Sequence, residues 1–95
     1  MNVIWSDRAN TDLRQIFERR EELSPESATR LVDAITTRTH QLAAFPDSGR
    51  MMPEFENRYL RELIEGDYRI IYERFPDRVE IVSVAHGKQS FLSPD

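Results

Sequence analysis

Cysteine is absent from the 95 residues of this chain, which excludes a disulfide framework, a cysteine nucleophile and a cysteine-based zinc or iron–sulfur site. Only three glycines occur, at Gly49, Gly66 and Gly87, and they are too scattered to form a phosphate-binding loop. No run of about 18 apolar residues is present, so no membrane-spanning helix is predicted. The amino terminus shows no secretory signal pattern. These absences favour a cytoplasmic protein of one domain without a cofactor.

Lysine is almost absent as well. Of thirteen basic residues, Lys88 is the one lysine, and seventeen acidic residues bring the net charge to −4. A free-standing nucleic-acid binder normally carries a basic excess, because pairing with phosphates supplies most of its affinity. The charge balance therefore disfavours bulk nucleic-acid binding. The planar guanidinium of arginine suits bidentate pairing with a carboxylate or a phosphate.

The first half of the chain contains two helix start signals. Ser6 followed by Asp7 is a predicted helix N-cap, and Ser24-Pro25 is a second one. Apolar residues recur at helical spacing after each start: Ala9, Leu13, Ile16 and Phe17, then Ala28, Leu31, Val32, Ile35 and Leu42. We expect a short strand over 1–5 and a helical hairpin over 6–45, which Pro46 ends.

The second half changes period. Residues 46–57 show no periodicity and are predicted to form a loop, which at this length is often functional. Apolar residues then alternate over 58–86, which predicts three strands joined by short turns and therefore paired antiparallel. Residues 87–95 are predicted to form a C-terminal tail. The whole chain, 1–95, is thus predicted to be one α+β domain of order β-α-α-β-β-β, with an N-terminal helical hairpin on a curved antiparallel sheet.

Alternation also predicts the face on which each strand residue lies. Tyr68, Ile70 and Tyr72 share one face of their strand, and in the last strand Ile81 and Ser83 point opposite to Val82 and Val84. Both faces of the sheet are mixed in character. The face away from the helices is expected to be partly open and suited to a protein partner.

Two residues are candidates for chemistry. His86 ends the last predicted strand, where it can act as a general acid or base or simply bond to a backbone carbonyl. Arg61 follows the long loop, with Arg50 and Arg58 close in sequence. Such a trio can hold a phosphate or a carboxylate, whereas Arg61 can equally pair with acids across the sheet. The histidines have no neighbours at ligand spacing, and no metal site is predicted.

Four segments resemble the RelE/ParE superfamily of bacterial toxins: FPDSGR at 45–50, YLRELIEGDYRIIYE at 59–73, VEIVSVAHGK at 79–88, and the opening IWSDRANTDLRQI, which is similar to the ParE-like branch. The resemblance covers nearly the whole chain in the right order. It implies two N-terminal helices on a curved antiparallel sheet. It also implies the toxin of a type II toxin–antitoxin, plasmid stabilisation-like module, neutralised by a cognate antitoxin in a hetero-oligomer.

The superfamily divides by target. RelE-like members cut mRNA on the ribosome as interferases, and ParE-like members poison DNA gyrase. By this resemblance, Arg61 falls on the strand arginine that the nucleases use, and His86 falls near the position where some of them carry a histidine. No tyrosine follows His86, however, and the lysine-rich helix and loop are missing. The resemblance therefore favours a gyrase inhibitor without chemistry of its own. A ribosome-dependent mRNA endonuclease, or a degenerate member that binds its antitoxin without toxicity, is the alternative.

The expected sites follow these hypotheses. Under the nuclease alternative, Arg61 stabilises phosphate charge and His86 is the acid or base. The residues expected to contact the target or a partner are Arg50, Arg58, Arg69 and Lys88. The antitoxin is expected on the helical hairpin and on the edge of the N-terminal strand, where an extended peptide can pair. The expected contacts there are Arg14, Phe17 and Arg38.

Overall fold

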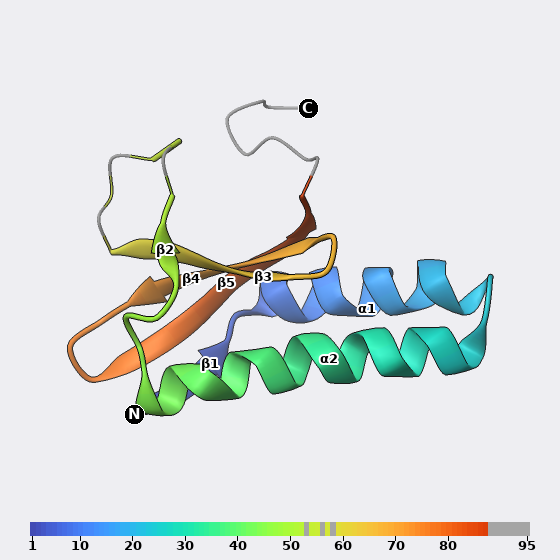
Figure 1. The fold of residues 1–95 in the computed structure, drawn as a ribbon, viewed down its shortest axis with the longest axis horizontal. Helices are drawn as coiled ribbons and strands as arrows, with labels where there is room; N and C mark the ends of the chain where they lie inside the picture. The colour runs from blue at the N-terminus through green and yellow to red at the C-terminus, as the bar shows by residue number, and fades with distance from the viewer. Residues whose placement is uncertain (53, 56, 58, 88–95) are drawn as a thin grey trace.

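Two helices cover one face of a five-stranded sheet in the computed structural model, which describes residues 1–52, 54–55, 57 and 59–87 (Figure 1). The elements in chain order are β1 (Asn2–Trp5), α1 (Asp7–Glu21), α2 (Pro25–Ala44), β2 (Arg50–Met51), β3 (Leu60–Glu65), β4 (Tyr68–Arg74) and β5 (Arg78–His86). The predicted α+β class is confirmed. Within the described ranges, neither helix is long and apolar enough to cross a membrane.

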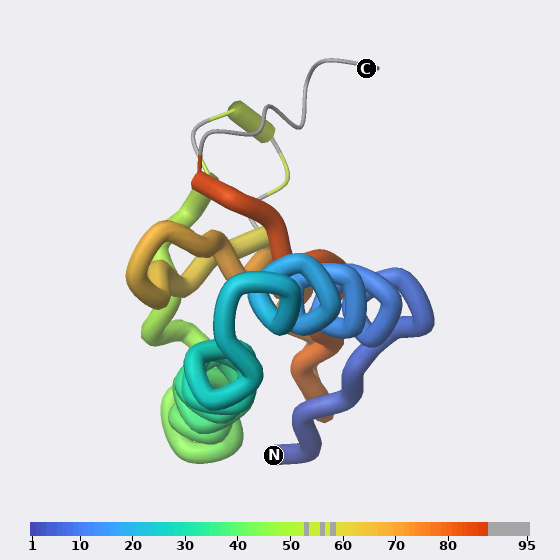
Figure 2. Tube along the Cα trace, turned by 90° about the vertical axis from the view of Figure 1, so that its right-hand side faces the viewer, coloured from blue at the N-terminus to red at the C-terminus, as the bar shows by residue number. Residues whose placement is uncertain are grey.

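Both helices begin where the sequence predicts. The Ser6 hydroxyl accepts a hydrogen bond from the Ala9 amide at 3.0 Å, and the Ser24 hydroxyl accepts one from the Ser27 amide at 3.2 Å. These caps satisfy amides that have no partner within the helix. Pro25 occupies the first turn of α2, where its missing N–H is harmless. Only residues 22–24 connect the two helices, so α1 and α2 run antiparallel side by side (Figures 1 and 2).

The sheet has the strand order β1-β5-β4-β3-β2. β1 pairs parallel with β5, and the other neighbours pair antiparallel. β2 lies inside the segment predicted as a loop, with Arg50 opposite Glu62 and Met51 opposite Arg61. The loop prediction is therefore wrong at these two residues, because a two-residue strand is too short to show a period.

A β-bulge in β5 changes the predicted faces of that strand. Ile81 pairs with Tyr72 and Val84 pairs with Ile70, so the register skips Val82. Ile81 and Val84 are both buried in the core between helices and sheet. The prediction that they point to opposite faces is wrong, because the extra residue of a bulge shifts the alternation. The prediction that Tyr68, Ile70 and Tyr72 share one face of β4 is confirmed, because Ile70 and Tyr72 are in the core and Tyr68 packs against it.

Glu54 lies on the side of the sheet away from the helices, because it pairs with Arg69, whose neighbours Tyr68 and Ile70 face the core under the helices. Met52 in the same segment after β2 is buried, and so are Glu62, Ile71 and Ala85 of the sheet. Ile64, on the same face as Glu62, is 45% exposed. This face is therefore covered at some positions and open at others, as expected for a partly open face.

The start of α1 closes the edge of β5 beyond the end of β1. The Ser6 amide donates to the Ile81 carbonyl and the Ser6 hydroxyl donates to the Val82 carbonyl, each at 3.0 Å. The Asp12 carboxylate accepts a hydrogen bond from the Val84 amide, also at 3.0 Å. Backbone groups that an edge strand would expose are thus satisfied by side chains and by the helix start.

Candidate functional site

The structure does not bring Arg61 and His86 together. Arg61 lies opposite Tyr72, which lies opposite Ile81, whereas His86 lies opposite Tyr68 at the other end of the hairpin. His86 lies five positions after Ile81 in β5, which corresponds to about 16 Å at about 3.3 Å per residue. One catalytic centre that uses both side chains is therefore not formed in this arrangement.

Arg61 holds the loop that follows α2. Its Nη1 donates to the carbonyl oxygens of Asp47 at 3.2 Å and Gly49 at 2.8 Å. Its Nε lies 3.9 Å from the Asp47 carboxylate. The anticipated pairing with acids across the sheet does not occur. The sequence could not reveal these contacts, because the partners are 12 and 14 positions away in an aperiodic segment.

Tyr72 also holds the loop that follows α2. Its hydroxyl donates to the Pro46 carbonyl at 2.8 Å and accepts from the Gly49 amide at 2.9 Å. Burial raises the pKa of the Tyr72 phenol, and the hydrogen bond from Gly49 partly opposes that rise. The phenol is therefore neutral at physiological pH and serves as a structural hydrogen-bonding group.

A second arginine reaches the same carboxylate. Arg74 Nε donates to Asp47 Oδ1 at 3.0 Å, and this oxygen is also the one closest to Arg61. The Asp47 side chain is 62% exposed. One exposed carboxylate thus faces two guanidinium groups at the end of the sheet. Neither Asp47 nor Arg74 was a predicted site residue.

Arg50 and Arg69, two of the predicted target-binding residues, meet at a buried acid. Glu62 is fully buried, and its carboxylate accepts from Arg50 Nε and from Arg69 Nε, each at 2.5 Å. Arg69 also pairs with Glu54. The Arg50 side chain is 65% exposed, whereas that of Arg69 is mostly buried. Arg58 and Lys88, the other two residues of that prediction, lie outside the described residues.

Charge pairing shifts two pKa values in this cluster. The hydrogen bond from Arg69 lowers the pKa of the Glu54 carboxyl, against a smaller opposing effect of burial. Burial by itself would lower the pKa of the Arg69 guanidinium, but its hydrogen bonds with Glu54 and Glu62 reverse the effect and raise it. Both groups are therefore charged at neutral pH, and the segment after β2 is tied electrostatically to β4.

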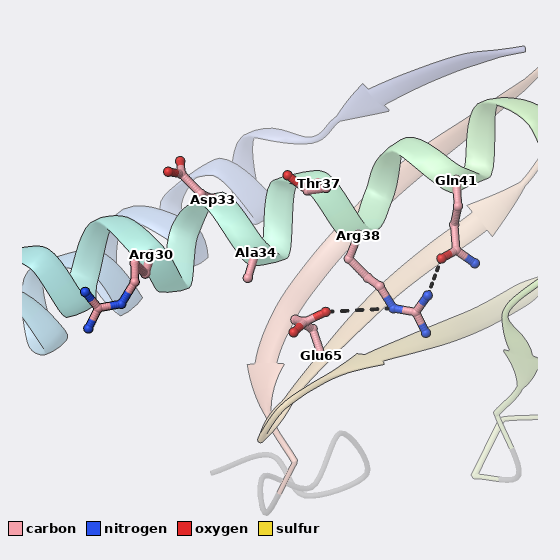
Figure 3. Close-up of a pocket in the computed structure, with 7 residues that line it drawn as sticks. All are labelled: Arg30, Asp33, Ala34, Thr37, Arg38, Gln41 and Glu65. Carbon is pink, nitrogen blue, oxygen red and sulfur yellow. Dashed lines mark hydrogen bonds and ion pairs between the residues drawn. The ribbon is translucent and has the colours of Figure 1, made fainter.

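An open depression of about 620 Å³ lies between α2 and the end of β3 (Figure 3). It is lined by Arg30, Asp33, Ala34, Thr37, Arg38, Gln41 and Glu65. Arg38 donates to the Ile64 carbonyl at 3.3 Å, and its Nε lies 3.9 Å from the Glu65 carboxylate. Of the three predicted antitoxin contacts, Arg38 lines this depression. Arg14 is exposed and Phe17 is half-buried, both on α1 and outside the lining.

Comparisons with known proteins agree with this architecture. The family model described as the ParE toxin of the type II toxin-antitoxin system, parDE, matches residues 3–91. The chromosomal ParDE system from P. aeruginosa has a similar fold, with a TM-score of 0.78 and 22% identity over 90% of this chain and 95% of that one. The RelBE2 toxin–antitoxin complex from Mycobacterium tuberculosis gives a TM-score of 0.67 and 21% identity over the same shares of the two chains.

No curated protein sequence matches this chain significantly. At these identities the two solved structures show a common fold, and the family model supplies the relationship. Since that model spans nearly all of the described residues, the chain belongs to the ParE toxin family of type II toxin–antitoxin systems, within the RelE/ParE superfamily.

Proposed function

We propose that this protein inhibits growth by binding DNA gyrase in the cytoplasm, and that a cognate antitoxin neutralises it in a hetero-oligomer. Membership of the ParE toxin family supports the general role. The observation that favours gyrase over mRNA is the separation of Arg61 from His86, which lie at opposite ends of the paired strands. His86 lies too far from Arg61 to act as the acid or base beside a phosphate held there, so the nuclease alternative lacks a joint site.

Electrostatics support the same choice. A toxin that enters the ribosome to cut mRNA must approach a dense phosphate backbone, whereas this chain carries a net charge of −4. Arg50 and Arg69, which could have formed a basic face, are instead paired with Glu62 and Glu54. Protein binding without chemistry requires no such face.

The antitoxin is proposed to bind along α2 and at the edge of the sheet formed by β1. Both similar structures are described as toxin–antitoxin systems or complexes, which supports a partner of this kind. The depression along α2 presents Arg30 and Arg38 to an acidic segment. β1 lies at the end of the strand order, where an extended peptide can add a strand.

The gyrase proposal is tested by supercoiling of relaxed plasmid with purified gyrase and increasing toxin. We expect supercoiling to be inhibited and then restored by an equimolar amount of antitoxin. Unchanged supercoiling at stoichiometric excess of folded toxin would contradict it. Primer extension on translated message then reveals mRNA cleavage, and growth that is unaffected by induction identifies a non-toxic member.

The antitoxin surface is tested by hydrogen exchange of the toxin with and without antitoxin. We expect protection in α2 near Arg38 and in β1. Arg38→Ala should weaken antitoxin binding, and Arg19→Ala, at an exposed position of α1, serves as the matched control. Protection confined to residues 46–57 would contradict this placement.

A further inference from the structure

Three exposed hydrophobic residues lie at the end of α2, in β2 and just before β3, and the ends of α2 and β3 concerned are at the left of Figure 1. Phe45 is 67% exposed, Met51 is 54% exposed and Tyr59 is 51% exposed. Phe45 is the C-cap of α2, and Met51 lies directly opposite Arg61 on the same face of the sheet. The Tyr59 carbonyl accepts the Arg74 amide at 2.9 Å. Each of the three residues is thus close, along the chain or across the sheet, to one member of the Asp47, Arg61 and Arg74 group.

The two arginines are already held in position. Arg61 is fixed by the carbonyl oxygens of Asp47 and Gly49, and Arg74 is fixed by the Phe75 carbonyl at 2.5 Å. The side chains of Arg61 and Arg74 are 24% and 26% exposed, so both are largely buried. A ligand that binds them loses little side-chain entropy, which favours affinity. Exposed aromatic residues beside fixed arginines are also the residue types that dominate protein interfaces.

The Asp47 carboxylate is held only weakly by Arg61 and Arg74. A single oxygen of its carboxylate serves both guanidinium groups, at 3.0 Å from Arg74 and 3.9 Å from Arg61. Because Asp47 is 62% exposed, water competes for its carboxylate, and an ion pair with such an exposed partner contributes little to stability. Arg61 keeps its two carbonyl bonds when the carboxylate leaves. A partner carboxylate can therefore replace Asp47 without disturbing the arginines.

We propose that this surface docks an acidic segment of the toxin's protein target, with a target carboxylate between Arg61 and Arg74 and target apolar side chains on Phe45 and Met51. The loop-end surface is defined as Phe45, Asp47, Met51, Tyr59, Arg61 and Arg74. The inference rests on the proposed function and names the part of the toxin that meets the target. None of the six residues lines the depression along α2, but Phe45 caps the same helix, so the test below measures antitoxin affinity as well.

The test uses full-length toxin with purified gyrase, growth arrest on induction, the melting temperature and antitoxin affinity. The double substitution Phe45→Ser/Met51→Ser should raise the toxin concentration needed for half-inhibition about tenfold, and Arg74→Gln should do the same. Asp47→Asn should lower that concentration about threefold, because it removes a competing anion. Leu23→Ser, at an exposed apolar position of the hairpin tip, is the matched control and should change nothing.

Each outcome decides the inference. A double variant as potent as the wild type overturns the docking surface while leaving the proposed function intact. Equal loss of gyrase inhibition and antitoxin binding, with an unchanged melting temperature, assigns the surface to the antitoxin and also overturns it. Weaker inhibition by Asp47→Asn overturns the carboxylate exchange.

Failure of the proposed function is distinguishable from these outcomes. If wild-type toxin arrests growth but leaves gyrase unaffected, the gyrase proposal is wrong and the same variants are scored by growth arrest. If the double variant no longer arrests growth, the docking surface is supported for another target. If the double variant still arrests growth, the docking surface is overturned. A wild type that neither arrests growth nor inhibits gyrase overturns both proposals.

Discussion

The ring of Tyr72 occupies the space that a side chain at Gly49 would need. A Cβ atom at position 49 would lie 2.6 Å from both Cε1 and the hydroxyl oxygen of Tyr72, and 2.7 Å from the Glu62 carbonyl oxygen. The close approach is required because the Gly49 amide donates to the Tyr72 hydroxyl. Position 49 is thus restricted to glycine by packing.

Gly49→Ala should therefore destabilise the fold by about 2 kcal/mol, the usual cost of overpacking. For a domain of this size that lowers the melting temperature by about 10 °C. Thermal denaturation measures the change. Gly66→Asn is the control, because Gly66 has a positive φ of 56° that asparagine tolerates and no neighbour within 4 Å. Equal melting temperatures for Gly49→Ala and wild type would contradict the packing argument.

The features that the sequence revealed are those set by neighbours along the chain. Ser6 and Ser24 mark the helix starts because each cap bonds an amide three residues later. The bulge at Val82 gives no such signal, since its carbonyl is bonded by a residue 76 positions away. The contact between Asp47 and Arg74 spans 27 positions and was missed for the same reason. Site residues that only folding brings together cannot be identified from their spacing along the chain.

Glu62 and Arg50 should differ sharply in their effect on stability, although they form one ion pair. Glu62→Ala removes a buried carboxylate from the mostly buried Arg69 and should cost about 3 kcal/mol. Arg50→Ala removes an exposed partner and should cost less than about 1 kcal/mol. Urea denaturation of both variants measures the difference. Equal losses would contradict the burial of Glu62.

The contribution of the Glu54–Arg69 pair should depend on pH. Because the pKa of Glu54 is lowered in the folded state from 4.5, its contribution is fully present above about pH 4.5 and disappears as the pH falls through the lowered value. Glu54→Gln should therefore destabilise the protein at pH 7, by about 1 kcal/mol or less. The two proteins should converge in stability in acid. Denaturation at pH 7 and near pH 3 provides the comparison, and a constant difference would contradict the pairing.

His86→Gln should leave growth inhibition intact. His86 meets Tyr68 edge-on, with ring centroids 5.5 Å apart, so a structural role predicts a stability change of no more than about 1 kcal/mol. Growth after induction and the melting temperature are measured together. A sharp loss of toxicity with an unchanged melting temperature would instead favour the nuclease alternative.

The parallel pairing of β1 with β5 joins the first strand to the last one. Asn2 lies opposite Arg78 and Trp5 lies opposite Ile81, so the first strand has no partner until residues 78–81 have been synthesised. Contacts between such distant residues form late, because closing a long loop is entropically costly. Both helices meanwhile leave the ribosome with the core side of Ala9 and Ile35 still uncovered. A chain interrupted before β5 therefore cannot complete this sheet, and the toxin reaches its working shape only after residues 78–86 have been synthesised.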